Sequence, residues 1–318
     1  MEHTIKHSIK NIRKTFRDNG VFYTPPELAY YLKSFLPDDV DEIYDPTCGD
    51  GGLLYVFDEN VKKYGQEIDE SQAKIAQERL VNAEIIAGDT LTNPAFIDKK
   101  FKYIIANPPF SLKWEPKSDE RFAELPALPP KSKADFAFLA HILYYLADNG
   151  TAVVLCSPGI GYRGNAEYKI RKYFVEKNYI DCVIAVEGDK FDDTTIPTLI
   201  LILKKNRDSD SVRFVDKDKE ATIRKNQIVE NDFNLSVNTY IEREYKPKID
   251  DVSPVALRQE IQDSVIKSIR TQLELEKMLG EINNVSDVLG ESDGLNVFIQ
   301  KIRALLDEFS TNKTKLND

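Results

Sequence analysis

An amide, two prolines and an aromatic ring follow a short apolar run in the sequence KYIIANPPFS, which covers residues 102–111. An exocyclic amino nitrogen on a base is a poor nucleophile because its lone pair is delocalised into the ring. Two acceptors aimed at its N–H bonds would localise that pair, and the side-chain oxygen of Asn107 and the carbonyl of Pro108 could supply them. Pro108 and Pro109 fix the backbone and remove donors, so both acceptors would keep one geometry. Phe110 would offer a face on which an extruded base could stack.

A glycine-rich turn and three acidic residues accompany this corner. The turn, DPTCGDGGLL over 45–54, lies between an expected strand and an expected helix, whose first N–H groups could face a carboxylate or a phosphate. Asp45, Glu67 and Asp89 follow consecutive expected strands. This order suits S-adenosylmethionine, with Asp45 near the methionine ammonium, Glu67 at the ribose and Asp89 at the adenine amino group. The dinucleotide fingerprint G-x-G-x-x-G is absent, which argues against NAD.

Together these features predict direct attack of an amino nitrogen on the sulfonium methyl group, promoted by positioning and desolvation. Neither a metal nor a covalent nucleophile is needed. In isolation, each acid would fit a solvated carboxylate, and the corner would fit a tight turn with a core Phe110. Their order along the chain favours the catalytic interpretation.

The elements that must position these residues alternate along the chain. Strands are expected at 42–44, 63–67, 84–87, 102–106, 151–156, 180–186 and 199–204. Helices are expected after Pro25-Pro26, after the glycine turn, and at 70–82, 135–147 and 165–178, with 135–147 amphipathic. This alternation predicts an α/β fold with a doubly wound, mostly parallel sheet that binds ligands at the carboxyl ends of its strands.

The chain is expected to form a short N-terminal helix at 1–20, a catalytic domain at 21–245 and a helical, coiled-coil-like tail at 246–318. The segment 206–250 is charged and irregular, with a brief strand signal at 212–215. Apolar residues of the tail recur at the spacing of a helix face. The tail would form either a helical hairpin on its own domain or a docking surface for a second subunit.

Composition limits the function classes. The net charge of −10 is unlike that of an autonomous DNA binder, so a local basic face or a partner would supply much of the grip on nucleic acid. No apolar run approaches the roughly 18 residues of a membrane helix, and the start MEHTIKHSIKNIRKTF lacks a signal-peptide core. Three cysteines without C-x-x-C spacing indicate reduced thiols rather than disulfides or zinc. We expect a cytoplasmic protein with no metal site and no membrane association.

The ordered set FYTPPELAYYL, DPTCGDGGLL, GQEID, GDTL and IANPPF resembles the amino-group DNA methyltransferases of the gamma arrangement. More closely, the chain resembles the modification subunit of type I restriction–modification systems, through ADFAFLAHILYYLADNGTAVVL, GYRGNAEYKIRKYFVE and FDDTTIPTLILIL. The resemblance implies the class I S-adenosylmethionine-dependent methyltransferase fold and adenine-specific methylation of N6 in DNA. It implies double-stranded DNA with the target adenine flipped out, and a hetero-oligomer with a specificity subunit and, as a further candidate, a restriction subunit.

The resemblance also assigns roles by position. The residues that match the cofactor-methionine cap are Phe22, Tyr23, Thr24 and Pro25. The glycine motif contains Asp45, Thr47, Cys48 and Gly49, with Glu67 at the ribose and Asp89 at the cofactor adenine. The catalytic tetrapeptide matches Asn107, Pro108, Pro109 and Phe110, and Phe191 matches a second aromatic that stacks on the target base.

Two departures from the family pattern bear on cofactor binding and on DNA binding. Asp50 stands where Ser or Thr is usual, so an extra carboxylate either weakens cofactor binding or faces solvent. About 20 residues precede Phe22, where the family has a long helical domain that helps to hold DNA. Independent DNA binding is therefore in doubt. The alternative functions are methylation of a protein glutamine amide or an RNA base amino group, and a non-catalytic module that binds the cofactor and serves assembly.

Overall fold

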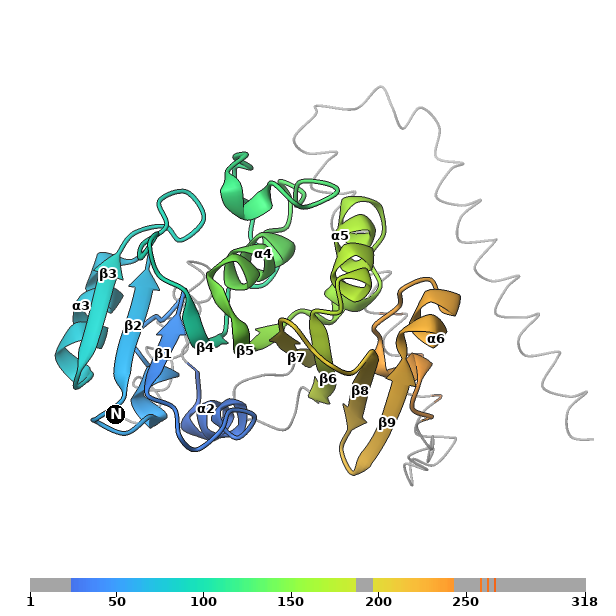
Figure 1. The fold of residues 1–318 in the computed structure, drawn as a ribbon, viewed down its shortest axis with the longest axis horizontal. Coiled ribbons are helices and arrows are strands. Elements are labelled where there is room, and N and C mark those ends of the chain that lie inside the picture. Colours follow the sequence, from blue (N-terminus) through green and yellow to red (C-terminus); the bar gives the residue numbers. More distant parts are fainter. Residues whose placement is uncertain (1–23, 187–196, 243–257, 259–261, 263–265, 267–318) are drawn as a thin grey trace, which may run out of the picture. The chain divides into compact units, whose positions relative to one another are not determined.

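The computed structural model describes residues 24–186 and 197–242 and three positions beyond them, Arg258, Gln262 and Ile266 (Figure 1). The expected helix at 1–20, nearly all of the expected tail at 246–318 and the candidate residues Phe22, Tyr23 and Phe191 lie outside the described residues. The chain divides into two compact units, Met1–Glu244 and Tyr245–Asp318, and the sheet belongs to the first.

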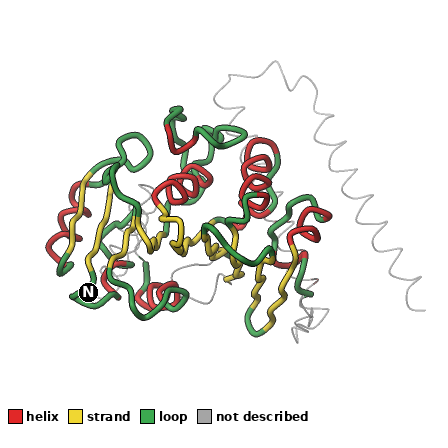
Figure 2. The backbone as a smooth tube through the Cα atoms, in the orientation of Figure 1, coloured by secondary structure: helices red, strands yellow, loops and turns green. Residues whose placement is uncertain are grey.

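Nine strands of the described segments form one sheet in the order β3-β2-β1-β4-β5-β7-β6-β8-β9 (Figure 1, Figure 2). They are β1 (Glu42–Asp45), β2 (Lys62–Glu67), β3 (Ala83–Ala87), β4 (Phe101–Ala106), β5 (Leu146–Cys156), β6 (Ile180–Val186), β7 (Thr198–Lys204), β8 (Ser211–Asp216) and β9 (Lys219–Arg224). Neighbours are parallel, except that β7 is antiparallel to β5 and β6, and β9 to β8. The prediction of a mostly parallel, doubly wound α/β sheet is confirmed.

Helices cover both faces of this sheet (Figure 1). The α-helices of the two described segments are α2 (Pro26–Lys33), α3 (Glu70–Arg79), α4 (Asp135–Tyr145), α5 (Asn165–Glu176) and α6 (Lys225–Glu230). Successive strand residues point to opposite faces, so β4 serves two cores. Ile104 and Ala106 join the cluster that includes α4 and α5, whereas Tyr103 and Ile105 join the cluster that includes α2. Burial on both faces explains why this strand is a continuous apolar run.

The strand order places a switch point between β1 and β4. From β1 the chain continues to β2 and β3 on one side, and it returns to β4 on the other side of β1. Connections that leave in opposite directions open a crevice at the carboxyl ends of the two strands, where open α/β sheets bind ligands. Asp45 ends β1 and Asn107 follows β4, so both residues lie at this edge.

The prediction of a helix after the glycine turn was wrong. The chain forms only a three-residue 3-10 turn there, Leu54–Val56. Phe57 then leaves in an extended conformation, and the N–H of Val61 donates to the carbonyl of Asp58 at 3.1 Å to close a turn directly before β2. The return to β2 leaves too little chain for an α-helix, so no helix N-terminus faces the turn.

The helix expected at 135–147 is α4, but it ends at Tyr145 and is not amphipathic. Leu146 begins β5 because it pairs with Phe101 of β4. Ten of the 11 residues of α4 are buried, since Trp114 and Phe122 cover the side that faces away from the sheet. A helix that is covered on all sides carries no polar stripe.

The segment 206–250, expected to be irregular, extends the sheet in its described part. β8 and β9 form an antiparallel hairpin, and β8 is parallel to β6. Val212 and Phe214 alternate with polar residues and enter the main core, which anchors the hairpin. Here the brief strand signal was correct, and charged residues lie on both strands of the hairpin.

Candidate functional site

The amide of Asn107 is oriented by a residue far away in the sequence. Its Nδ2 donates a hydrogen bond to Oγ1 of Thr24 at 3.2 Å. Among the described residues, its Oδ1 has no hydrogen-bond partner and is left as an acceptor. Pro108 is buried behind it, whereas Pro109 and Phe110 are half-buried, and Phe110 packs against the cluster that includes α2. The geometry therefore provides an oriented amide acceptor on a rigid corner.

The glycine turn crosses closely over β2. The N–H of Cys48 donates to the carbonyl of Gln66 at 2.9 Å, and the N–H of Gly49 donates to Oε2 of Glu67 at 2.9 Å. A Cβ at Gly65 would lie 2.7 Å from Sγ of Cys48, so only glycine permits this approach. Gly49 has φ +54°, and a Cβ there would meet nothing within 4 Å. The turn thus faces open space on its outer side.

Asp45 is buried at the base of the turn. Its Oδ1 accepts hydrogen bonds from the N–H of Thr47 at 2.9 Å and from the Thr47 hydroxyl at 3.4 Å. Burial raises the pKa of Asp45 from 3.8 to about 7; the hydrogen bond from the Thr47 N–H opposes the shift, and the negative charge of Glu67 adds to it. A cation placed beside this carboxyl would stabilise its ionised form.

Asp50, the departure from the family pattern, is engaged by its own chain. Its Oδ1 accepts from the N–H of Gly52 at 3.1 Å, and its Oδ2 pairs with Nη1 of Arg79 at 2.8 Å. The guanidinium of Arg79 also lies over the ring of Tyr55, 4.3 Å from its centroid. The extra negative charge is therefore compensated by α3.

Glu67 is the last residue of β2 and lies at the same edge of the sheet. One oxygen of Glu67 accepts from Gly49, and the other accepts from the N–H of Asp69 at 3.0 Å. A carboxylate has about four lone-pair sites, so each oxygen can accept again. Ile68 beside it is 67% exposed, although apolar. Sequence reasoning missed Ile68; an apolar residue between two acids was the available signal.

Asp89 follows β3 and organises its own turn. Its Oδ1 accepts from the N–H of Leu91 at 2.9 Å, and its Oδ2 accepts from the Thr92 hydroxyl at 2.7 Å. Thr90 between them donates its hydroxyl to the carbonyl of Pro46, which ties this turn to the glycine turn. The three acids thus lie on connected segments at one edge.

A buried chain of hydrogen bonds supports these turns from below. Arg121 donates Nη1 to the carbonyl of Thr90 at 2.7 Å and to Nδ1 of His141 at 3.0 Å. Nε2 of His141 lies 3.1 Å from the hydroxyl of Tyr44. Burial, with Arg121 beside it, holds the pKa of His141 well below its ordinary value, so the ring is neutral. Because arginine only donates, the His141 proton resides on Nε2. His141 is a core residue.

A family comparison identifies the class of protein to which this geometry belongs. Residues 7–272 match the family described as N-6 DNA Methylase, which is more than half of the chain. The chain belongs to the N-6 DNA Methylase family. The expected resemblance to the N6-adenine DNA methyltransferases is confirmed.

Relatives of this N-6 DNA Methylase member include subunits of type I restriction enzymes. A methylase subunit from Mycoplasma pneumoniae is 36% identical over 237 residues, which cover 64% of this chain and 44% of that protein. A type I methyltransferase subunit from Streptococcus thermophilus has a solved structure with a TM-score of 0.64 and 33% identity, covering 70% of this chain and 60% of the other. The chain spans less than half the length of the curated relatives it matches.

A more distant structure supports the fold. A protein from Listeria monocytogenes, titled as a putative class I S-adenosylmethionine-dependent methyltransferase, has a TM-score of 0.50 at 19% identity and covers 63% of this chain and 67% of the other. At this identity the likeness concerns the fold alone. The sheet of this N-6 DNA Methylase member is that of the class I methyltransferase fold.

Most sequence-predicted site residues come together at one edge of the sheet. Thr24 lies between the glycine turn and the corner. Its hydroxyl accepts the hydrogen bond from Asn107, and its carbonyl oxygen would lie 3.5 Å from a Cβ built at Gly52. Pro25 precedes α2 as its N-cap. The other predicted residues lie at or just after the carboxyl ends of β1 to β4: Asp45, Thr47, Cys48, Gly49, Glu67, Asp89 and the corner residues 107–110. Phe22, Tyr23 and Phe191 lie outside the described residues.

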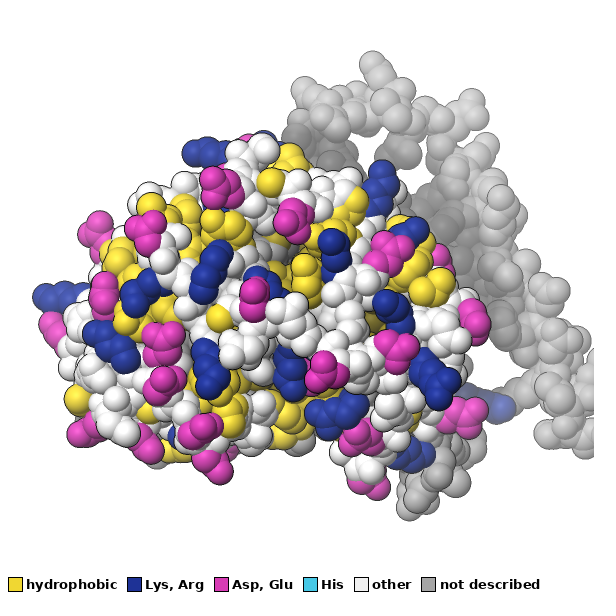
Figure 3. All heavy atoms as spheres, in the orientation of Figure 1, with side chains coloured by type: hydrophobic (Ala, Val, Ile, Leu, Met, Phe, Trp, Pro, Cys, Tyr) yellow, Lys and Arg dark blue, Asp and Glu magenta, His cyan; other side chains and the backbone are white. Residues whose placement is uncertain are grey.

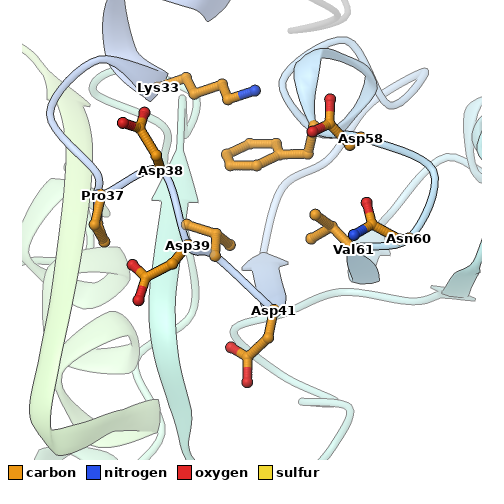
Figure 4. A pocket seen from close by; sticks show the side chains of 10 residues that line it. Lys33, Pro37, Asp38, Asp39, Asp41, Asp58, Asn60 and Val61 are labelled. Atoms are coloured by element: carbon orange, nitrogen blue, oxygen red, sulfur yellow. The ribbon is translucent and has the colours of Figure 1, made fainter.

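A separate cavity lies at the opposite edge. Its volume is about 330 Å³, and Lys33, Asp38, Asp41 and Asp58 are among the residues that line it (Figure 4). Val61 precedes β2 there, so the cavity faces the amino ends of the strands and is remote from the corner. In the described part of the chain, no cluster of three metal-ligating residues is formed. None of its helices is long and apolar enough to cross a membrane.

Proposed function

We propose that this chain transfers a methyl group from S-adenosylmethionine to the N6 amino group of adenine in DNA, as the modification subunit of a type I-like restriction–modification system. The observation that carries the proposal is the Asn107 amide, whose nitrogen is held by Thr24 while its oxygen is left as an acceptor at the ligand-binding edge. Family membership and the type I relatives support the reaction class.

The residues at this edge fit the proposed cofactor. A bound S-adenosylmethionine would supply an activated sulfonium methyl group. The open space at Gly49 leaves room for a ligand against the turn, and the second lone pairs of Glu67 suit two ribose hydroxyls. Ile68 would cover a face of the adenine, and Asp89 its amino group. Asp45 would meet the methionine ammonium, with the cap completed by Phe22, Tyr23, Thr24 and Pro25 and by Thr47 and Cys48 of the turn.

The corner would activate and hold the target. Oδ1 of Asn107 and the carbonyl of Pro108 would accept the two N–H bonds of the adenine amino group, which localises its lone pair for attack. As its bond to the methyl carbon formed and the methyl–sulfur bond broke, the nitrogen would gain positive charge, which the same two oxygens would stabilise until one N–H proton was released. Phe110, and Phe191 by the proposed assignment, would stack on the flipped base. Positioning and exclusion of water supply most of the rate enhancement.

Partner subunits would contribute much of the affinity for DNA. Over the face seen in Figure 3, basic and acidic side chains of the described residues are interspersed rather than gathered into a basic groove. The net charge of −10 also indicates that this chain alone would bind DNA weakly. We therefore place the chain in a cytoplasmic assembly with a specificity subunit, to which the region 246–318 would contribute contacts, and with a restriction subunit as a further partner.

The proposal is tested by methyl transfer from labelled S-adenosylmethionine. The full chain is incubated with mixed-sequence DNA, with and without the specificity subunit, and N6-methyladenine is mapped. Asn107→Ala is expected to bind the cofactor within about threefold of the unaltered chain and to lose at least about 100-fold in transfer, because it removes a transition-state acceptor. Label in RNA or in a protein glutamine, or undiminished transfer by Asn107→Ala, would overturn the proposal.

A further inference from the structure

A buried ionic cluster lies directly behind the corner. Nη1 of Arg163 is 3.6 Å from Oδ2 of Asp135 and 3.3 Å from Oε1 of Glu167. Nη2 of Arg163 donates to the hydroxyl oxygens of Ser157 at 3.0 Å and Ser111 at 3.2 Å. The side chains of Asp135 and Glu167 are 5% and 7% exposed, so both carboxylates are withdrawn from water and depend on this arginine.

The cluster connects to the corner through Ser111. Oδ2 of Asp135 accepts the N–H of Ser111 at 3.1 Å, immediately after Phe110. Ser111 has φ +53°, a left-handed conformation that is unfavourable for a residue with a side chain. Such a conformation persists only where its surroundings impose it. The hydrogen bond from the Ser111 N–H to Asp135 fixes the peptide between Phe110 and Ser111, and hence the direction in which the chain leaves the corner.

Arg163 is itself held in place from several sides. A Cβ at Gly159 would lie 2.1 Å from its Nε, so the guanidinium occupies the space that any larger residue would take. Nη1 of the buried Arg171 donates to the Arg163 carbonyl at 2.7 Å. Burial also raises the pKa of Glu167, against the opposing charge of Arg163. The support therefore rests on α5 and the segment after β5, and it reaches the corner through Asp135 at the start of α4.

We propose that Asp135 is a positioning residue for methyl transfer: it fixes the left-handed turn at Ser111, which sets the placement of Phe110 and the Pro108 carbonyl against the target amino group. The inference rests on the proposed function of the corner. Glu167 balances the same arginine but forms no hydrogen bond or ion pair with the described residues 107–111. Glu167 is therefore a matched control, because neutralising it changes the same charge network and keeps the hydrogen bond from the Ser111 N–H to Asp135.

The first test is kinetic and uses the full chain with its specificity subunit. Asp135→Ser suits a helix start but is too short to reach Ser111. It is expected to lower kcat by about 10- to 100-fold at saturating substrates, with the cofactor Kd within about twofold. Asp135→Asn keeps an oxygen acceptor and is expected to stay within about threefold, as is Glu167→Gln. Asp135→Asn as slow as Asp135→Ser, or Glu167→Gln as slow as either, would assign the effect to charge balance and overturn the proposal.

The second test needs no activity. Hydrogen exchange at the Ser111 amide of the full chain is expected to be about 10-fold faster in Asp135→Ser, with amides of α5 unchanged, and to be unaltered in Glu167→Gln. Equal Ser111 exchange in Asp135→Ser and the unaltered chain would overturn the inference. If the unaltered complex transfers no methyl group, the proposed function fails, and this exchange measurement alone decides whether Asp135 fixes the turn.

Discussion

At the scale of single residues, the orientation of the Asn107 amide depends on one hydroxyl. Thr24→Val keeps the shape of the side chain but leaves Nδ2 of Asn107 without its 3.2 Å partner, so the amide can rotate and lose its acceptor position. We expect transfer to fall about 10- to 100-fold, whereas Thr24→Ser, which keeps the hydroxyl, stays within about threefold. Single-turnover rates at saturating cofactor measure both. A Thr24→Val variant that matched Thr24→Ser would show that another group orients Asn107.

A second residue-scale prediction concerns the buried carboxyl of Asp45. Its folded-state pKa of about 7 lies above the ordinary 3.8, so the folded chain keeps a proton that the unfolded chain releases between these values. The resulting stability is complete below pH 3.8 and is lost as the pH rises to about 7. Asp45→Asn removes this loss while keeping an acceptor for Thr47. Without cofactor, we expect Asp45→Asn to be more stable at pH 8, by up to about 4 kcal/mol.

The readout is the difference in unfolding free energy between Asp45→Asn and the unaltered chain at pH 8 and pH 4.5, from denaturant titrations. It should be large at pH 8 and small at pH 4.5. The same substitution should weaken cofactor binding at pH 8, where Asp45 is ionised, since a neutral amide cannot pair with an ammonium. An equal stability difference at both pH values would rule out titration of Asp45 as the cause.

At the scale of elements, α3 compensates the negative charge that Asp50 adds to the glycine turn. Nη1 of Arg79 in α3 lies 2.8 Å from Oδ2 of Asp50. Arg79→Met would leave an unpaired carboxylate beside the proposed cofactor carboxylate. We expect cofactor affinity to fall about threefold to tenfold at low salt, a modest change because the pair is partly exposed. Adding Asp50→Ser should restore affinity, as it removes the repelling charge and keeps an acceptor for Gly52. Calorimetric titration of the two single variants and the double variant measures the coupling, and a double variant no better than Arg79→Met would contradict it.

Some elements could be predicted from local sequence patterns, and others could not. Strand β4 was predictable because the apolar run and the Asn-Pro-Pro stop are local signals. The helix expected after the glycine turn was wrong because the early return to β2 is a tertiary constraint. Likewise, α4 carries apolar residues on every side because Trp114 and Phe122, from the loop that precedes it, fold back and cover it. The acids and the corner could be found from their order along the chain. The Thr24 bond to Asn107 and the cluster around Arg163 could not, because they join segments that only the fold brings together.

At the scale of the whole molecule, charge decides how DNA is held. Log affinity for DNA falls with log salt in proportion to the number of phosphates that a protein neutralises. A chain with a net charge of −10 and interspersed surface charges should therefore bind mixed-sequence DNA weakly and with a shallow salt slope. Addition of the proposed specificity subunit should both tighten binding and steepen the slope by several units. Fluorescence anisotropy of labelled duplex DNA between about 50 and 200 mM salt measures both quantities. If the slope for the chain alone were as steep as that of the complex, this chain would supply the phosphate contacts itself. The prediction that the partner contributes much of the DNA affinity would then be wrong.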